Sequence, residues 1–199
     1  MDLEKLKKNL KARCIDCYVA ASREDAVQHL LDQVQNTTVG IGGSKTVDTL
    51  GLYDRLCETN EVHWHWKDGF VPEVYRAAED AEVYLSSVNG IAETGELVNI
   101  DGKGNRVAAL TYAVGKRLFL IAGTNKVCPD LNAAMERARK VAAPANVPKL
   151  PGNRPCNTTG QCFDCRSEAR GCCVMQIIMF RPMGVKHMEL ILIDEELGF

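Results

Sequence analysis

The chain has 199 residues, of which 46% are hydrophobic, and its 24 basic and 26 acidic side chains give a formal net charge of −2. This length and composition predict one folded domain spanning residues 1–199, and they exclude a disordered tail or a disulfide-dense mini-protein. A charge near zero argues against nucleic acid as the main partner. No apolar run reaches the roughly 18 residues of a membrane span, and residues 1–13 lack the apolar core of a signal peptide, so we expect a cytoplasmic protein with no membrane partner.

The first half of the chain alternates helix and strand patterns, which is typical of an α/β protein with a largely parallel central sheet flanked by helices. Leu3, Leu6 and Leu10 lie at helical spacing among lysines. Ser22, three residues before Asp25, predicts a helix N-terminus. The expected elements are helices around 3–10 and from Ser22 to about 35, a strand at 38–41, a helix at about 46–57, a strand at 62–64, a helix at 72–78 and a strand at 82–86.

A β-hairpin is expected to interrupt this alternation. Segments 95–100 and 105–110 flank Asp101-Gly102-Lys103-Gly104, and an Asp-Gly step tolerates the positive φ that tight hairpins need. The continuous apolar run 118–122 predicts a strand buried on both faces, at the centre of the sheet. The remaining pattern predicts a helix at 130–142 and two closing strands, at 174–180 and 189–193, that return to the sheet.

Five of the nine cysteines gather in a proline-broken, Cys-rich loop at about 144–173, and they are Cys156, Cys162, Cys165, Cys172 and Cys173. In a reducing compartment such a group favours metal binding over disulfides. The C-x-x-C pair 162/165, Cys156 and either Cys172 or Cys173 would supply four thiolates, which suits zinc or an iron–sulfur cluster such as [4Fe-4S]. The alternative is free thiols in a loop.

The other four cysteines are further away in the sequence. Cys14 and Cys17 form a second C-x-x-C pair, which could supply ligands if it folds near the first. Cys57 and Cys128 are expected to be small core residues.

Gly42, Gly43, Ser44, Lys45 and Thr46 lie where a predicted strand gives way to a helix. Backbone N–H groups at such a turn bind phosphate or carboxylate, so these five residues are candidates for binding a small anionic ligand. The segment is not a P-loop, because Ser44 separates the glycine from the lysine. The alternative is a tight turn in which Ser44 or Thr46 caps the helix.

Two further loops follow predicted strands, at the edge where α/β proteins bind ligands. Glu93 is the candidate general base or nucleophile there, and the alternative is a surface glutamate. Asn125 and Lys126 follow the central strand, and Lys126 could neutralise an anionic ligand. His63 and His65 alternate along a predicted strand, where they could bind a metal or form a structural pair.

Six segments, in this order along the chain, resemble the LUD-domain family (lactate utilisation protein C-like, a former domain of unknown function). They are Gly-Ile-Gly-Gly-Ser-Lys-Thr at 40–46, Ala-Glu-Thr-Gly at 92–95, Asp-Gly-Lys-Gly-Asn-Arg at 101–106, Gly-Thr-Asn-Lys at 123–126, the cysteine segment 155–165, and Glu-Leu-Gly-Phe at 196–199. The resemblance implies a fold like the NagB/ribose-5-phosphate isomerase (RpiA)/CoA-transferase group. Within that group some transferases use a glutamate nucleophile, which by analogy would be Glu93.

The resemblance also implies a role in L-lactate utilisation, in which family members act with iron–sulfur partner proteins to oxidise lactate to pyruvate. Because the chain lacks ferredoxin-type cysteine runs, our leading hypothesis is an accessory or electron-transfer subunit with a metal or iron–sulfur cluster on the 156–173 cysteines. The alternatives are an isomerase or transferase acting on a phosphorylated or CoA-linked substrate, and a non-catalytic subunit that binds a partner.

Overall fold

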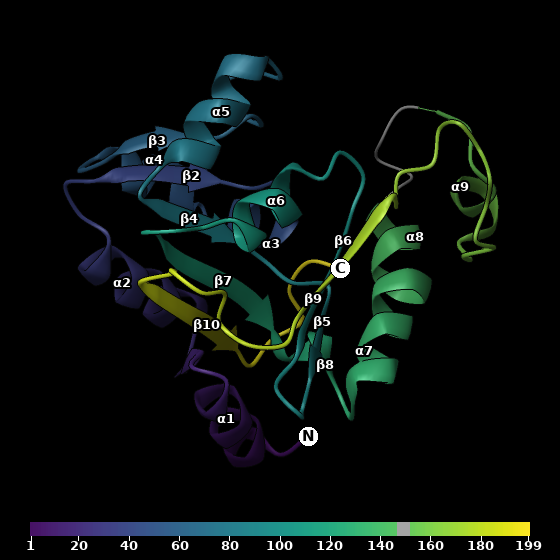
Figure 1. Ribbon diagram of the computed structural model, residues 1–199, viewed down its shortest axis with the longest axis horizontal. Helices are drawn as coiled ribbons and strands as arrows, with labels where there is room; N and C mark the ends of the chain where they lie inside the picture. The colour runs from purple at the N-terminus through teal and green to yellow at the C-terminus, as the bar shows by residue number, and fades with distance from the viewer. Residues whose placement is uncertain (147–151) are drawn as a thin grey trace.

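The computed structural model describes residues 1–146 and 152–199, and its centre is a six-stranded sheet in which every strand pair is parallel (Figure 1). The strand order is β1-β10-β7-β4-β2-β3. These strands are β1 (Asp16–Ala20), β2 (Thr38–Ile41), β3 (Glu61–His63), β4 (Val83–Ser86), β7 (Arg117–Gly123) and β10 (His187–Ile193). The predicted α/β class is confirmed, and the apolar run 118–122 lies within β7 in the interior of the sheet.

Helices cover both faces of this sheet, as the alternation of buried side chains along β7 requires. Leu118 and Leu120 pack with residues of α1 and α6, whereas Phe119 and Ile121 pack with residues of α2, α3 and α4. The helices are α1 (Leu3–Ala12), α2 (Arg23–Gln33), α3 (Lys45–Thr49), α4 (Leu52–Cys57), α5 (Pro72–Asp80) and α6 (Asn105–Thr111). Ser22 is the N-cap of α2, as predicted, and its hydroxyl accepts from the backbone N–H of Asp25.

A smaller sheet with the order β8-β5-β6-β9 lies beside the large one, and α7 packs against it. Its strands are β5 (Gly90–Ala92), β6 (Leu97–Asp101), β8 (Val127–Cys128) and β9 (Val174–Ile178), and the helix that packs on them is α7 (Leu131–Arg137). The prediction that both closing strands return to one sheet was wrong for the first of them, because β9 pairs with β6 and only β10 joins the large sheet.

The predicted hairpin was wrong in its second arm. Residues 105–111 form the helix α6, which begins after Gly104 in the left-handed region at φ 86°. Ala108, Ala109 and Leu110 are strong helix formers, and Leu110 packs into the core of the large sheet. The hairpin that does form joins β5 to β6 in antiparallel register, through residues 93–96.

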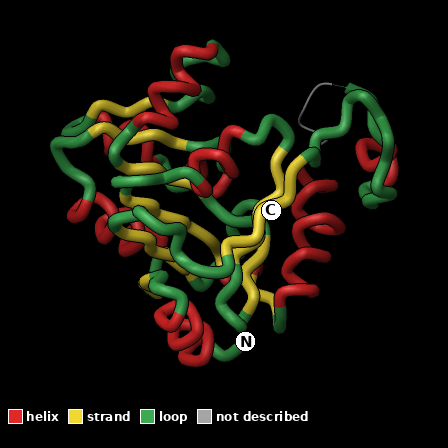
Figure 2. Tube along the Cα trace, in the orientation of Figure 1, coloured by secondary structure: helices red, strands yellow, loops and turns green. Residues whose placement is uncertain are grey.

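Other predicted segments also differ in the structure. The helix expected at 46–57 is divided into α3 and α4 at Gly51, whose φ is 62°. The helix expected at 130–142 continues from α7 through a π-helical turn, Ala138–Ala142, into α8 (Ala143–Asn146). The proline-broken stretch is mostly loop but contains α9 (Pro155–Thr159), and its residues 147–151 lie outside the described residues (Figure 2).

Candidate functional site

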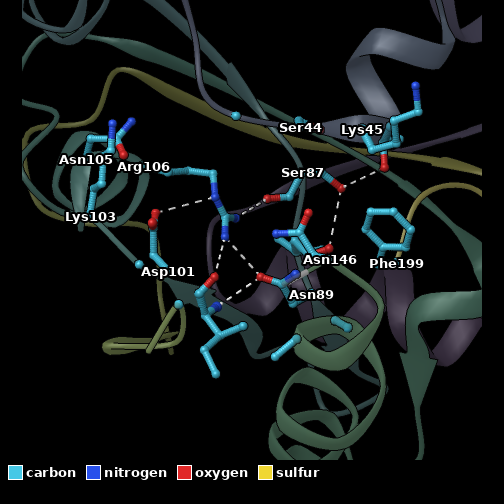
Figure 3. A pocket seen from close by; sticks show the side chains of 18 of the residues that line it. Ser44, Lys45, Ser87, Asn89, Asp101, Lys103, Asn105, Arg106, Asn146 and Phe199 are labelled. Carbon is cyan, nitrogen blue, oxygen red and sulfur yellow. Dashed lines mark hydrogen bonds and ion pairs between the residues drawn. The ribbon is translucent and has the colours of Figure 1, made fainter. Parts of the chain in front are cut away.

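A pocket of about 430 Å³ lies at the carboxyl ends of β2, β4 and β7 (Figure 3). The segments 43–46, which follow β2, and 87–89, which follow β4, form part of its wall, together with Lys126 after β7. Within the large sheet, β3 follows β2 in the chain and lies on one side of it, whereas the next strand after β4, namely β7, lies on the other side. The chain reaches β7 only after passing through β5 and β6 of the smaller sheet. Ligands of open α/β sheets bind where neighbouring connections diverge in this way, so this central pocket is the candidate site.

The described wall of the central pocket is strongly cationic. Its basic residues are Lys45, Lys103, Arg106, Lys126, Arg154 and Arg170, and Asp101 is the acidic side chain among the described lining residues. His65, Trp66, Phe70 and Tyr75 add aromatic surface. Because the charges are concentrated in a concave site, the pocket favours a small anion even though the whole chain is close to neutral.

Arg106 organises one wall of the pocket (Figure 3). It is buried, and its two terminal nitrogens donate to four oxygens, those of the Ser87 and Ile100 carbonyls (3.0 and 2.7 Å) and of the Asn99 and Asn89 side-chain amides (2.6 and 3.0 Å). Its Nε lies 3.6 Å from a carboxylate oxygen of Asp101. Burial lowers the pKa of Arg106, and the nearby Asp101 opposes that shift. With these donors engaged, Arg106 ties the loop after β4 to β6.

Lys126 is a buried amine in the same pocket, with only 2% of its surface exposed. Its Nζ donates to the hydroxyls of Thr46 (3.1 Å) and Ser87 (2.9 Å). Burial lowers the pKa of Lys126 to about 7, and the positive charges of Arg137 and Arg106 act in the same direction. A large fraction of Lys126 is therefore neutral at physiological pH, so that it can act as a base or a nucleophile.

Four of the five residues predicted from the glycine turn line the central pocket, namely Gly43, Ser44, Lys45 and Thr46. Ser44 caps α3, because its hydroxyl accepts from the backbone N–H of Val47 at 3.2 Å. The Ser44 cap that the tight-turn alternative predicted is thus present, while anion binding by this turn stays a prediction. The Thr46 hydroxyl accepts from Lys126 in the pocket. Gly42 packs against Tyr84 and Arg106 behind the wall instead.

Two other predicted residues are not among the described lining residues of the pocket. Glu93 follows β5 on the side facing α1, where its carboxylate accepts from the backbone N–H of Asp2 at 3.1 Å and lies 3.7 Å from Lys5 Nζ. Asn125 contacts the C-terminal segment instead, since its side-chain oxygen accepts from the backbone N–H of Leu197 at 3.3 Å. The placement of Glu93 gives no support to its predicted role, which stays a prediction.

The structure brings four of the five clustered cysteines together. Cys156, Cys162, Cys165 and Cys172 line one small pocket, which we call the cysteine pocket. Cys173 is exposed, and its Sγ points toward the carbonyl of Arg170 at 3.2 Å. Burial raises the pKa of Cys172, the positive charge of Arg170 opposes that shift, and the nearby Cys162 and Cys165 sulfurs add to it.

The cysteine pocket and the central pocket share part of their walls, namely Ala143, Arg154 and Gly171. Arg170 lines the central pocket and also holds the cysteine loop, donating to the carbonyls of Cys165 and Cys172 at 2.8 Å each. The backbone N–H of Cys173 donates to the Asp101 carbonyl at 2.8 Å. The cysteine loop is thus part of the same site.

Within residues 1–146 and 152–199, no group of three or more His, Cys, Asp or Glu side chains is arranged to hold a metal ion. Zinc bonds to sulfur at about 2.3 Å, which would require thiolates about 3.8 Å apart. A single ion therefore does not fit the present arrangement of the cysteines. Four thiols are the donor set of iron–sulfur clusters, so a cluster on these cysteines stays a prediction.

The remaining cysteines, and the predicted site residue His65, do not line the cysteine pocket. Cys17 is partly buried on β1, where burial raises its pKa to about 11, and Cys14 is exposed. Cys128 is buried as predicted, but Cys57 is exposed at the end of α4, so its predicted core position was wrong. His65 lines the central pocket and stacks on Tyr75 at 4.6 Å between ring centroids.

Sequence reasoning missed most of the pocket residues outside the glycine turn. The missed polar residues include Ser87, Asn89, Asp101, Lys103, Arg106, Arg154 and Arg170. Ser87 had a usable signal, since it directly follows a predicted strand at the ligand-binding edge of the sheet. The others belong to segments whose contacts depend on the second sheet, which the strand patterns did not reveal.

The fold and the site define an α/β protein with a cationic pocket at the carboxyl ends of parallel strands. The family model for the LUD domain matches residues 3–193. The chain therefore belongs to the LUD-domain family, as the ordered motifs predicted. Comparisons with curated proteins and with solved structures gave no significant match. Among the described residues, none of the helices combines the length and hydrophobicity that a membrane crossing requires.

Proposed function

We propose that this LUD-domain protein contributes to L-lactate utilisation as an accessory or electron-transfer subunit. In this proposal it binds a small carboxylate anion in the central pocket and an iron–sulfur cluster on Cys156, Cys162, Cys165 and Cys172. The observation that carries the proposal is the shared wall of the two pockets. When bound, such a cluster supplies one-electron transfer.

The contacts of the cysteine loop support the choice of ligands. Arg170 donates to two cysteine carbonyls and to the Asp164 carboxylate (2.8 Å), which fixes the loop around Cys165 and Cys172. Arg154 donates to the Ala169 carbonyl from the other side of the loop. Cys172 lines the cysteine pocket and Cys173 does not, which supports Cys172 as the fourth ligand in this proposal.

The cluster is tested by anaerobic reconstitution with iron and sulfide, followed by iron analysis and visible absorption. We expect Cys172→Ser to lose most of the bound iron and its absorption, because one thiolate of the set is removed. Cys173→Ser, one residue away, is the matched control and should keep both. Equal losses in the two variants, or no iron bound by the wild-type chain, would refute the cluster.

The central pocket is tested by calorimetric titration with L-lactate, pyruvate and inorganic phosphate. The described wall supplies basic side chains that suit a carboxylate, and Lys103 is exposed there with its Nζ 2.7 Å from the Tyr75 hydroxyl. Replacing Lys103 by Met should weaken carboxylate binding about tenfold, the effect of losing one charge-assisted hydrogen bond. Lys11→Met, on α1, is the control and should bind like wild type. Binding of phosphate alone would refute the carboxylate assignment.

A cluster-bearing subunit also needs an electron partner. We propose that this partner is an iron–sulfur protein, which would dock where the cysteine loop is exposed, around Phe163. Co-purification of the reconstituted chain with such a protein, lost in the Cys172→Ser variant, is the expected result. The Cys173→Ser variant should retain the partner.

A further inference from the structure

Lys126 is a reactive group to which the proposed function gives no chemical role. It is a buried amine that lines a ligand pocket, and its hydrogen-bond partners are two hydroxyls. In the described part of the chain, no carboxylate lies within ion-pair distance of its Nζ. A lysine that only balanced a structural charge would be expected to have such a carboxylate close by.

We propose that Lys126 is a catalytic nucleophile that forms an imine with the carbonyl carbon of a small 2-oxo carboxylate bound in the central pocket. The inference rests on the proposed function for its carboxylate ligand, and it adds a covalent step to that function. Pyruvate is the natural probe, because it carries both the carboxylate and the adjacent carbonyl.

The hydrogen bonds of Lys126 suit an attack by its nitrogen. A neutral amine has two hydrogens and one lone pair. Thr46 Oγ1 at 3.1 Å and Ser87 Oγ at 2.9 Å accept both hydrogens, which leaves the lone pair unengaged. The positive charges of Arg106 and Arg137 favour the neutral form. Desolvated lysines beside other cations are the ones that serve as imine-forming nucleophiles.

The surroundings of the amine also suit the reaction. Gly198 packs directly over it, since a methyl group at Gly198 would lie 3.3 Å from the Nζ atom and would meet the Thr46 hydroxyl. This close cover limits the water that reaches the nitrogen. In this proposal the substrate carboxylate is held by Lys103, which is exposed on the wall of the same pocket.

The step balances without any oxidant or reductant. The lone pair of Nζ attacks the carbonyl carbon, and the carbonyl π bond opens to give a carbinolamine. The two hydrogens of the amine and the carbonyl oxygen then leave as water, and a carbon–nitrogen double bond remains. The hydroxyls of Ser87 and Thr46 touch Nζ and are placed to carry these protons to the departing oxygen.

The test is reduction with sodium borohydride in the presence of pyruvate, followed by peptide mapping by mass spectrometry. We expect one stable adduct, a 1-carboxyethyl group on the nitrogen of Lys126, which is the secondary amine left when the imine is reduced. The Lys126→Arg variant keeps hydrogen-bond donors at this position but should lose the adduct, whereas Lys103→Met should still form it at higher pyruvate concentration. Circular dichroism of Lys126→Arg checks that its fold is intact.

The outcomes separate this inference from the proposed function. L-Lactate has no carbonyl carbon, so its binding by calorimetry tests the pocket alone. Lactate binding without any adduct at Lys126 overturns the imine and leaves the proposed function standing. An adduct at Lys126 without lactate binding supports the imine and overturns the lactate assignment. Labelling of Ser87 by a fluorophosphonate, with Lys126 unmodified by pyruvate, would overturn the imine in favour of a Lys126 that acts as a base.

Discussion

Because its amine is buried, Lys126 should make the free energy of unfolding depend on pH. The substitution Lys126→Met should remove this dependence. Burial lowers the pKa of Lys126 from its ordinary value of 10.5 to about 7. Between these two values the unfolded chain holds a proton at this residue that the folded chain lacks. The free energy of unfolding therefore rises with pH from about 7 to about 10.5, as the cost of removing that proton fades.

The size of the effect is set by the two pKa values. One pKa unit corresponds to about 1.4 kcal/mol, so at pH 7 folding with Lys126 in place costs about 4 kcal/mol, and at pH 9 about 2 kcal/mol. Methionine fills a similar volume and does not titrate. The stability of Lys126→Met relative to wild type should therefore decrease by about 2 kcal/mol between pH 7 and pH 9, whatever its packing contributes.

Urea unfolding followed by the fluorescence of Trp64 and Trp66 measures this difference. The comparison of variant with wild type at each pH cancels the titration of the other lysines and cysteines. Lys45→Met, at an exposed position of the same pocket, is the control, and its difference from wild type should stay flat over the same range. A constant difference for Lys126→Met would show that the amine keeps its proton in the folded state, contrary to this expectation.

Other consequences of the structure can be measured with single variants. Arg106→Met removes four buried hydrogen bonds and leaves Asp101 without its ion-pair partner, so the free energy of unfolding should fall by about 3–5 kcal/mol in urea titrations. Gly40→Ala would place a methyl group against the Ala78 carbonyl of α5 and should cost about 2–3 kcal/mol, whereas Gly43→Ala meets only ordinary contacts from 3.4 Å and should cost less than about 1 kcal/mol by the same assay. Glu93→Gln should leave calorimetric lactate binding within about twofold of wild type, because its carboxylate faces α1; a loss of binding near tenfold, about 1.4 kcal/mol, would restore Glu93 as a site residue.

The elements predicted best from the sequence are those whose signal is local. The apolar run of β7 and the Ser22 cap of α2 were correct, because burial on both faces and capping are both visible in a few consecutive residues. The Asp101–Gly104 turn was misleading for the opposite reason. An Asp-Gly step permits a tight turn but does not determine the structure of the next segment, and the helix α6 is stabilised there by the packing of Leu110 in the core.

The site was only partly predictable, because its most informative residues depend on contacts between distant segments. The sequence pointed to Lys126 beside a ligand-binding edge, yet its burial comes from Thr46 and Ser87, which are 80 and 39 residues away. Arg106 was placed on a hairpin strand, and its role as the tie between two sheets has no local signature. For the cysteines, spacing alone left Cys172 and Cys173 equivalent, and the fold distinguishes them.

The cationic side chains of the central pocket divide into two kinds, and the division bears on what the pocket can recognise. Arg106 and Arg170 have their donors engaged by carbonyl, amide and carboxylate oxygens of the protein itself, so they contribute charge without direct contacts to a ligand. The amine of Lys103 contacts the Tyr75 hydroxyl and lies over the rings of Tyr75 and Phe70, whereas the amine of Lys126 donates to the hydroxyls of Thr46 and Ser87. We therefore expect a small anion in this pocket to meet a positive field from the guanidinium groups and to make its direct contacts with lysines. Fixed charge with few direct donors suits a small anion better than a ligand with many groups to be recognised, in agreement with a two- or three-carbon carboxylate.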